Sequence, residues 1–287
     1  MTASLPGWYE ETLYPDVGQR FRLGEIVYRT GTGLQELVIF ENPVLGRVLA
    51  LDGIIQTSEA DEFIYHEMLT HVPILAHGDV RRVLIIGGGD GGMLRRVLEH
   101  RRIEKVTMVE IDRNVVDLSI QYLPSISAGA FDDPRTNLVI ADGRDFVAAH
   151  TDTYDVILVD STDPAGPAEA LFTQDFYADC KKRLTSGGIL CTQNGVPFFQ
   201  PEELRNTHRR FSGLFADAGF FTAAVPTYYG GLMALGWGTD NKALRGQTVE
   251  QIRPRAKSAN LKARYYTPEV HVGAFALPKF MQDILAS

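Results

Sequence analysis

From Arg82 onward, the chain repeats one pattern: a short apolar segment rich in β-branched residues, a turn, and then a segment with helical spacing. The first repeat joins the strand-like RVLIIGGG, residues 82–89, to the helical GGMLRRVLEH, residues 91–100. Later strands are expected over 105–112, 137–143, 154–160 and 187–194, helices over 113–123, 173–184 and 201–219, and a hairpin over 226–240. This alternation predicts an α/β fold, a doubly wound and mostly parallel sheet with helices on both faces.

Ahead of this pattern, residues 20–58 have the composition of β-strands. Three segments, 21–30, 35–42 and 46–59, are rich in β-branched and apolar residues, and Asp52-Gly53 in the last is a strong hairpin signal. Residues 61–77 change to helical spacing, with Asp61 near the expected helix N-terminus. We therefore divide the chain into an N-terminal β domain with its connecting helix, residues 1–73, and a Rossmann-like nucleoside-binding domain, residues 74–287.

The charge balance and the cysteines limit the partners and the compartment. The 287 residues carry a formal net charge of −8 and no basic stripe, so a nucleic-acid partner is not expected. No uncharged apolar stretch is long enough to cross a bilayer, and the first residues lack the form of a signal peptide. Cys180 and Cys191 belong to no CxxC or His/Cys cluster. We expect a cytoplasmic protein with two reduced thiols, no metal and no membrane partner.

Ligands of doubly wound sheets bind beside the carboxyl ends of the strands, and this rule selects candidate residues by position. The selected positions are Gly87–Gly92, Glu110, Asp142-Gly143, Asp160–Asp163 and Gln193-Asn194. Four of these five strand ends carry a carboxylate.

The sequence GGGDGG, residues 87–92, follows a strand and opens a helix. Glycines at such a turn, including Gly87 and Gly89, allow the backbone to approach a ligand closely. Glu110 ends the next strand about twenty residues later, where an acidic side chain commonly accepts hydrogen bonds from ribose hydroxyls. Together these features favour an adenosine-type ligand. The alternatives are a tight turn without a ligand and a strand-end glutamate that faces solvent.

Asp90 lies inside this loop and separates the possible ligands by charge. Its carboxylate would repel a pyrophosphate and would also oppose the carboxylate of intact S-adenosylmethionine, but it would attract an ammonium group. The best ligand is therefore a sulfonium nucleoside whose tail keeps the amine and has lost the acid. The alternative is that Asp90 caps the following helix.

Asp160 and Asp163 follow a buried strand, with no lysine or arginine nearby in sequence and no histidine or cysteine close enough to indicate a metal. Carboxylates without such partners favour a bound cation, and amines on a short alkyl chain fit that requirement. An amine is nucleophilic only when neutral, so one carboxylate must also accept its proton. We assign that role to Asp160 and the holding of an amine to Asp163; the alternative for Asp163 is capping within a proline-rich turn.

At this point the chain resembles the spermidine synthase (polyamine aminopropyltransferase) family, and bacterial spermidine synthases in particular. The motifs are GGGDGGMLRRVLEH, MVEID, DDPR with ADG, DSTDPAGPAEALFTQDFY, LCTQNG, PTYYGG and LALDGIIQTSEADEFIYHEMLTHVP, which together cover nearly the whole chain. The resemblance implies transfer of an aminopropyl group from decarboxylated S-adenosylmethionine to putrescine, with release of methylthioadenosine. It implies no cofactor, since the donor is a co-substrate, and a homodimer or homotetramer.

The resemblance also implies roles for individual residues. The nucleoside side would be formed by Gln35, Glu110, Asp142, Gly143 and Pro167. The amine-binding side would be formed by Tyr65, His66, Asp90, Asp160, Asp163, Gln193 and Tyr228, with Asp160 as the proton acceptor. Without the resemblance, we would interpret His66 as a histidine on a helix surface and Tyr228 as part of ordinary aromatic packing.

Three other functions share part of this pattern. A methyltransferase that uses intact S-adenosylmethionine has the same fold and glycine loop but leaves Asp90 and the pair Asp160–Asp163 without a role. A non-catalytic nucleoside or polyamine sensor would use the same pocket without turnover. A nicotinamide dehydrogenase would place a pyrophosphate against Asp90. The sequence leaves open the acceptor's length, the oligomeric state, and whether desolvation or a carboxylate dominates deprotonation of the amine.

Overall fold

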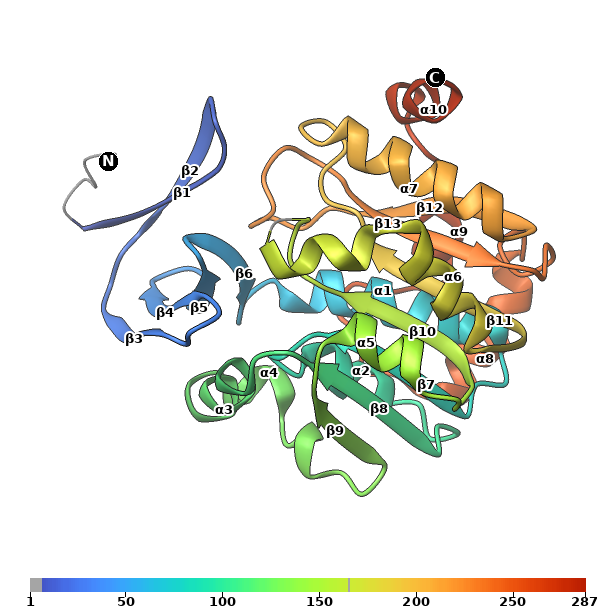
Figure 1. Cartoon of the computed structure of the whole chain (residues 1–287), viewed down its shortest axis with the longest axis horizontal. Coiled ribbons are helices and arrows are strands. Elements are labelled where there is room, and N and C mark those ends of the chain that lie inside the picture. The colour runs from blue at the N-terminus through green and yellow to red at the C-terminus, as the bar shows by residue number, and fades with distance from the viewer. Residues whose placement is uncertain (1–6, 165) are drawn as a thin grey trace.

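A computed structural model describes residues 7–164 and 166–287, without the side chains of residues 12, 166 and 167. Its centre is a seven-stranded sheet (Figure 1). The strands of this sheet are β7 (Arg82–Gly87), β8 (Lys105–Glu110), β9 (Thr136–Ile140), β10 (Tyr154–Asp160), β11 (Leu184–Gln193), β12 (Asp217–Ala223) and β13 (Met233–Thr239). The helices are α1 (Glu62–His77), α2 (Gly92–Leu98), α3 (Arg113–Tyr122), α4 (Pro124–Ser127), α5 (Gly143–Ala149), α6 (Gln174–Lys182), α7 (Pro201–Leu214), α8 (Val249–Ala259), α9 (Pro268–Ala274) and α10 (Lys279–Ala286), with the 3-10 helices η1 (Ala130–Asp132) and η2 (Gly166–Phe172).

The strand order creates a crevice at the carboxyl ends of β7 and β10. Across the sheet the order is β12-β13-β11-β10-β7-β8-β9. The chain runs outward from β7 through β8 to β9 and then returns to place β10 on the other side of β7, with these strands all parallel. Ligands of doubly wound sheets bind at such a switch point. The register places Asp160, the last residue of β10, beside Gly87, the last residue of β7.

Alternate residues of the central strands enter two hydrophobic cores on opposite faces of the sheet. In β7, Val83 and Ile85 belong to the core that includes α1, α2 and α8, whereas Leu84 and Ile86 belong to the core that includes α5, α6 and α7. None of the four is more than 1% exposed. Burial on both faces explains why a parallel strand reads as a continuous apolar run.

Side-chain caps fix where several helices begin at the carboxyl edge of the sheet. Asp112 accepts a backbone N–H at the start of α3, Asp142 accepts two at the start of α5, and Thr173 accepts one at the start of α6. Such caps satisfy backbone donors that a helix leaves free at its first turn. Asp112 and Asp142 lie just beyond β8 and β9, so they also fix the loops that border the crevice. Within the described ranges, no helix is long and apolar enough to span a membrane.

Two antiparallel sheets precede the α/β region. Their strands are β1 (Trp8–Tyr14) with β2 (Val17–Arg22), and β3 (Ile26–Gly31), β4 (Glu36–Asn42), β5 (Gly46–Leu51) and β6 (Ile54–Ser58). The predicted hairpin is confirmed, because Asp52 and Gly53 join β5 to β6 with φ angles of 49° and 85°. These positive angles explain the Asp-Gly pair, which tolerates such a turn.

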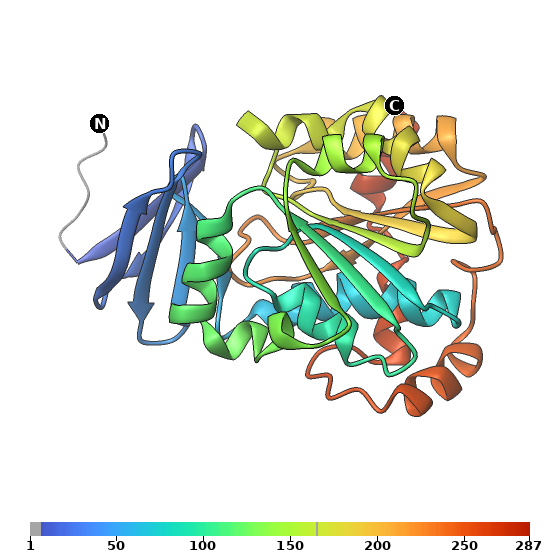
Figure 2. The ribbon, with the colours of Figure 1, turned by 60° about the horizontal axis from the view of Figure 1, so that its bottom comes forward.

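The four-stranded sheet packs beside α3 and α4 (Figure 2). Leu37 and Leu49 share a buried cluster with Val115 of α3 and Ile126 of α4. The connecting helix α1 contributes to the main core, where Met68 lies in the same cluster as β7 and β10 residues. The N-terminal strands are thereby held against the carboxyl edge of the central sheet. The division of the chain at residue 73 stays a prediction.

Two expectations near the C-terminus are wrong. Helix α7 ends at Leu214 and does not continue to residue 219, because the segment after it forms β12. Phe220 and Phe221 account for this difference, since they enter different buried clusters as neighbours on a strand do. The hairpin therefore joins β12 to β13, and residues 226–232 lie in the loop between them. The sequence pattern also did not reveal β1, most of β2, α4, α5 and α8–α10.

Candidate active site

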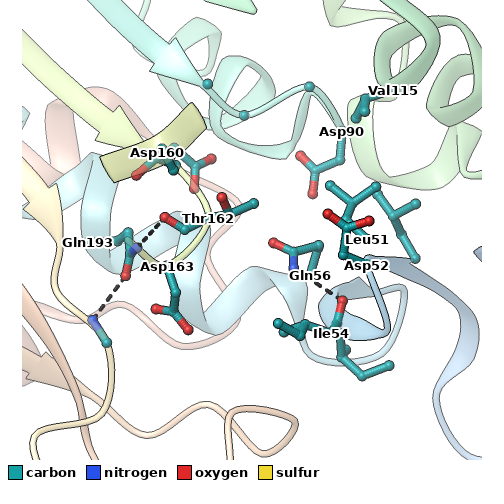
Figure 3. A pocket seen from close by; sticks show the side chains of 18 of the residues that line it. Leu51, Asp52, Ile54, Gln56, Asp90, Val115, Asp160, Thr162, Asp163 and Gln193 are labelled. Carbon is teal, nitrogen blue, oxygen red and sulfur yellow. Dashed lines mark hydrogen bonds between the residues drawn. The ribbon is translucent and has the colours of Figure 1, made fainter. Parts of the chain in front are cut away.

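A cavity of about 290 Å³ lies at the carboxyl ends of β7, β8, β10 and β11 and reaches the N-terminal sheets (Figure 3). The residues selected from the sequence that line it are Gln35, Tyr65, His66, Gly87, Gly89, Asp90, Glu110, Asp142, Gly143, Asp160, Asp163, Gln193 and Tyr228. Pro167 lies in η2, and the contact expected of it falls outside the described side chains. Among the described residues that line the cavity, none is lysine or arginine. The cavity is therefore strongly acidic.

The glycine loop contacts the end of β10 directly. Gly87 and Gly88 have φ angles of 85° and 75°, a region that favours glycine. A Cβ atom on Gly87 would lie 2.1 Å from the carbonyl oxygen of Asp160, and the N–H of Gly88 donates to the same oxygen at 3.0 Å. The loop after β7 and the residue at the tip of β10 therefore form one unit.

Asp160 has the position and the ionisation expected of a proton acceptor. The hydroxyl of Tyr65, on α1, donates to Asp160 Oδ1 at 2.6 Å. Burial raises the pKa of Asp160 to about 6; the nearby His66 opposes this rise and Asp90 adds to it. The carboxyl group is therefore ionised at neutral pH, and its basicity exceeds that of an ordinary aspartate.

Asp163 lies on the loop after β10, and the side chain of Gln193 anchors that loop. Gln193 Nε2 donates to the carbonyl oxygen of Thr162 at 3.0 Å, and its Oε1 accepts the N–H of Gly195 at 2.9 Å (Figure 3). Burial raises the pKa of Asp163, and hydrogen bonds from Gln200 and Gln193 partly offset this rise. Asp160 and Asp163 thus line one cavity, as expected from their spacing.

Glu11 and Tyr14 line the same cavity from β1 and were not selected from the sequence. Glu11 accepts hydrogen bonds from Gln19 Nε2 at 3.1 Å and from the N–H of Ile55 at 3.3 Å. Burial raises the pKa of Glu11 to about 7, and Asp163 contributes to that rise. The sequence of β1, WYEETLY, does not alternate between polar and apolar residues, so it carries no clear strand signal that could have located them.

Glu110 lies on the opposite side of the glycine loop from Asp160. Its Oε1 accepts the N–H of Asp112 at 2.9 Å, and its Oε2 lies 3.0 Å from where a Cβ on Gly89 would stand. Burial raises the pKa of Glu110 to about 7, although the hydrogen bonds from the Asp112 and Ile111 N–H groups act to lower it. Glycine at position 89 therefore leaves the space beside this carboxylate open.

Gln35 reaches this side of the cavity from the N-terminal sheet. Its Nε2 donates to Asp112 Oδ2 at 3.1 Å, which joins the segment before β4 to the end of β8. Asp142 caps α5 through its Oδ1, and Gly143 packs so closely that a Cβ there would lie 2.4 Å from Ile86. The residues expected around a nucleoside therefore gather at one end of the cavity.

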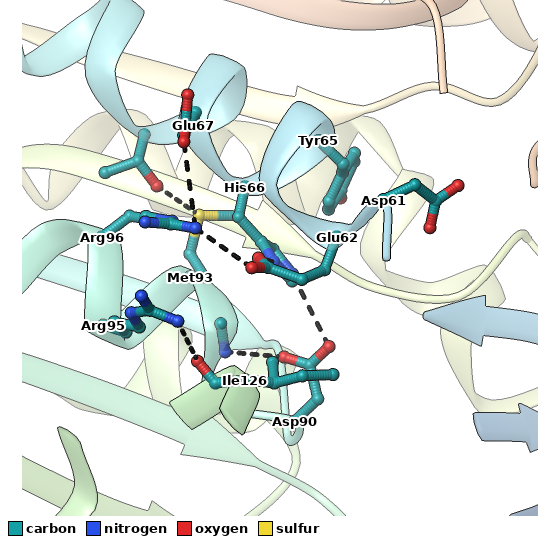
Figure 4. Close-up of polar contacts among 12 residues, drawn as sticks. Asp61, Glu62, Tyr65, His66, Glu67, Asp90, Met93, Arg95, Arg96 and Ile126 are labelled. Atoms are coloured by element: carbon teal, nitrogen blue, oxygen red, sulfur yellow. Dashed lines mark hydrogen bonds and ion pairs between the residues drawn. The ribbon is translucent and has the colours of Figure 1, made fainter. Parts of the chain in front are cut away.

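His66 and Asp90 meet at the wall of the cavity (Figure 4). Asp90 Oδ1 accepts the N–H of Gly92 at 2.8 Å, although the N-cap of α2 is Gly91 and not Asp90. Asp90 Oδ2 lies 3.6 Å from His66 Nε2, and His66 Nδ1 lies 2.7 Å from Glu62 Oε2. His66 is 3% exposed, so the alternative of a helix-surface histidine is wrong. The spacing of Glu62 and His66 at i and i+4 on a helix was a signal for their pairing.

Tyr228 lies in the loop between β12 and β13. Its hydroxyl donates to the carbonyl oxygen of Gln56, and its ring meets that of Tyr65 edge to face with centroids 5.8 Å apart. Its hydroxyl is therefore engaged with β6, and the ring forms the cavity wall. Over the residues that the structure describes, no cluster of three or more His, Cys, Asp or Glu side chains has a metal-binding arrangement.

Fold and cavity together define a Rossmann-like, methyltransferase-like protein with an acidic site at its strand ends. A family model described as the spermine/spermidine synthase domain matches residues 62–247, and one described as the spermidine synthase tetramerisation domain matches residues 7–59. The chain therefore belongs to the spermine/spermidine synthase family.

Relatives and solved structures agree with this assignment. Polyamine aminopropyltransferase 1 of Pseudomonas aeruginosa is 58% identical over 273 residues, which are 95% of this chain and 96% of the relative. The polyamine aminopropyltransferase of Escherichia coli O157:H7 is 55% identical over 279 residues, 97% of both chains. A spermidine synthase in complex with the transition state analogue AdoDATO has a TM-score of 0.92 at 38% identity, and the Thermotoga maritima spermidine synthase has 0.89 at 37%; each covers 97% of this chain and 94% of the other. The expected family and fold class are confirmed.

Replacing Gly87 by alanine tests the contact between the glycine loop and β10. We expect Gly87→Ala to lower the free energy of unfolding by about 2 kcal/mol or more, because a left-handed backbone costs an L-residue about 1–2 kcal/mol and the Cβ adds a clash. Gly273→Ala, on α9, is the matched control, since its Cβ would meet nothing within 4 Å. Urea denaturation measures both. Equal midpoints for the two variants would contradict the role given to Gly87.

Proposed function

We propose that this chain is an aminopropyltransferase that transfers the aminopropyl group of decarboxylated S-adenosylmethionine to putrescine, forming spermidine and methylthioadenosine. The observation that carries the proposal is the charge of the cavity. The acids lining it are Glu11, Asp52, Asp90, Glu110, Asp142, Asp160 and Asp163, without a lysine or arginine among its described lining residues. Such a cavity stabilises cationic ligands and disfavours phosphate. Family membership and full-length relatives named polyamine aminopropyltransferase support the same reaction.

The reaction is one direct displacement. A neutral amine attacks the methylene carbon beside the sulfonium, a C–N bond forms, and the C–S bond breaks with its electron pair remaining on sulfur. The leaving group is neutral methylthioadenosine, so it needs no acid. The proton of the attacking amine passes to Asp160, which is ionised at neutral pH and held by Tyr65. The enzyme otherwise contributes alignment of the two substrates.

The two ends of the cavity correspond to the two substrates. Glu110 and Gln35 lie at the end where the ribose would be held, with Asp142 and Gly143 beside the adenine. Asp90 and His66 face the aminopropyl tail, next to Asp160.

Asp163 and Glu11 lie beyond Asp160, where the second amine of the acceptor would be neutralised. Gln193, Tyr65 and Tyr228 complete the walls around the diamine.

The rival functions fit this cavity less well. Intact S-adenosylmethionine has a carboxylate for which the described lining offers no lysine or arginine, and methyl transfer leaves Asp163 without a role. A dinucleotide would set its pyrophosphate against Asp90. A sensor without turnover would not need Asp160 as a base beside the tail. We infer that no cofactor takes part, since the donor supplies the transferred group.

The family assignment also supports a proposal for the assembly and the compartment. The match of residues 7–59 to a tetramerisation domain supports a homo-oligomer, either a homodimer or a homotetramer. Val17, Ile26 and Val44 in this segment are more than two fifths exposed, so the segment offers apolar surface for such an interface. Cys180 and Cys191 are both free and buried, which agrees with a cytoplasmic, reducing compartment.

Asp160→Asn tests the proton acceptor. The variant keeps the shape of the side chain and removes its basicity, so we expect turnover to fall about a hundredfold or more while methylthioadenosine still binds. Product formation by mass spectrometry and calorimetry with methylthioadenosine measure the two properties. Asp152→Asn, an exposed change, serves as the control. Turnover within a few-fold of the parent would remove Asp160 from the role of base.

Asp90→Asn tests selection of the donor by charge. The amide oxygen of the asparagine can still accept the N–H of Gly92, while the charge facing the tail is lost. Binding of the decarboxylated donor should weaken by about 1.5–3 kcal/mol, the range for a hydrogen bond to a charged group. Methylthioadenosine has no aminopropyl tail and should bind nearly as before. Calorimetry on parent and variant gives the dissociation constants. An equal loss for both ligands would show that Asp90 only holds the turn.

The ionisation of Glu110 makes nucleoside binding depend on pH. Glu110 has a pKa of about 7 in the free site, and only its ionised form accepts hydrogen bonds from two ribose hydroxyls. Affinity for methylthioadenosine should therefore be full above pH 7 and should fall as the pH drops below it. Glu110→Gln should bind more weakly at high pH and lose this dependence. A parent with constant affinity from pH 5.5 to about 8.5 would contradict the assignment of Glu110.

A further inference from the structure

A chain of buried charges runs from the core to the amine side of the cavity (Figure 4). Arg96 of α2, only 2% exposed, donates from Nη2 to Glu62 Oε1 at 3.0 Å. Glu62 Oε2 lies 2.7 Å from His66 Nδ1, and His66 Nε2 lies 3.6 Å from Asp90 Oδ2. Arg96 also donates to Glu99 at 2.9 Å, which fixes it on its own helix. His66 is therefore held between two acids, one structural and one in the cavity wall.

Glu62 determines which nitrogen of His66 exchanges a proton. Burial alone would raise the pKa of Glu62, but the hydrogen bond and charge of His66 and the charge of Arg96 outweigh this effect and lower it. Glu62 is therefore a carboxylate, which only accepts hydrogen bonds. Nδ1 of His66 must then carry a hydrogen, and Nε2 is the atom that gains or loses one. The ring packs closely against the backbone of Gly92, where a Cβ would lie 2.2 Å from Cε1, and this contact limits its rotation.

The surroundings of His66 favour the imidazolium in the free site. Glu62 faces it from its own helix, Asp90 from the loop before α2, and Asp160 from the tip of β10. Arg96 and Arg95 lie behind Glu62, and the hydroxyls of Tyr65 and Tyr228 are bound to Asp160 and to the Gln56 carbonyl. Burial lowers the pKa of His66, but Asp90, Glu62 and Asp160 together raise it to about 9. A cation thus already faces the acids that a substrate ammonium would meet.

We propose that His66, positioned by Glu62 and Arg96, exchanges its Nε2 proton for the ammonium group of the donor. When the donor binds, the Nε2–H bond breaks, the proton goes to solvent, and the Nε2 lone pair accepts an N–H of the ammonium. One positive charge leaves and one enters, so the charge facing Asp90 and Asp160 is conserved. The inference rests on the proposed function, because it takes the donor's tail as the entering cation. Glu62 and Arg96 act as positioning residues.

Proton release on binding tests the exchange. Calorimetry at pH 8 in two buffers of different ionisation enthalpy counts the protons released per ligand. At this pH Glu110 and Asp160 are mostly ionised, because their pKa values are about 7 and about 6, whereas His66 is mostly protonated. We expect release of about one proton with decarboxylated S-adenosylmethionine and almost none with methylthioadenosine, which has no ammonium. The count with the donor should fall as the pH is raised through about 9.

Variants assign the proton to its source. His66→Gln keeps an amide beside Asp90 but has no titratable group, so donor binding should persist while release disappears. Glu62→Gln should reduce release at pH 8, because the charge that holds the imidazolium is gone. Arg113→Met should leave release unchanged, since Arg113 is exposed on α3 and pairs with Asp117. Equal release from parent and His66→Gln, or none from the parent while the donor binds, would overturn the exchange. Failure of the parent to bind the donor at all would overturn the proposed function.

Discussion

The pairing of β7 with β10 at the switch point is the constraint on which the site depends. Gly87 stands in register with Asp160, and the N–H of Gly88 donates to the Asp160 carbonyl. The loop that would approach the nucleoside and the residue that would take the proton are therefore fixed to each other through the backbone. A displacement of either one moves the other, so the distance between the donor's reacting carbon and the base is set by the sheet itself.

Concentrating acids in one enclosed cavity has an electrostatic cost in the free protein. The raised pKa values of Glu11, Glu110 and Asp160 all have burial as their largest cause. Cationic substrates relieve that cost, which favours binding, but the same carboxylates stabilise the ammonium form of the attacking amine and oppose its deprotonation. In the proposed reaction the raised pKa of Asp160 lessens this conflict, because a carboxylate with a pKa of about 6 accepts a proton more readily than an ordinary aspartate.

The sequence predicted the site residues that lie at strand ends, but it missed those that tertiary packing brings to the site. Asp160, Glu110 and the glycine loop were located because each follows an apolar run, and parallel strands bring such ends together. Glu11 was missed because the sequence of β1 lacks a clear polar–apolar alternation, and its place beside Asp163 depends on how the N-terminal sheets pack. Arg96 was missed because the helical pattern around it does not indicate that its charged group points inward and pairs with Glu62.

Asp90 shows why a structural and a functional interpretation of one residue need not exclude each other. Its Oδ1 is used by the N–H of Gly92 at the start of α2, which holds the carboxylate in one orientation. Its Oδ2 therefore points toward His66 and the cavity. The hydrogen bond to Gly92 thus orients the charge that selects the donor in the proposed function, and the other oxygen faces His66. The proposed selection by Asp90 and the proposed proton exchange by His66 therefore both depend on how these two oxygens are placed.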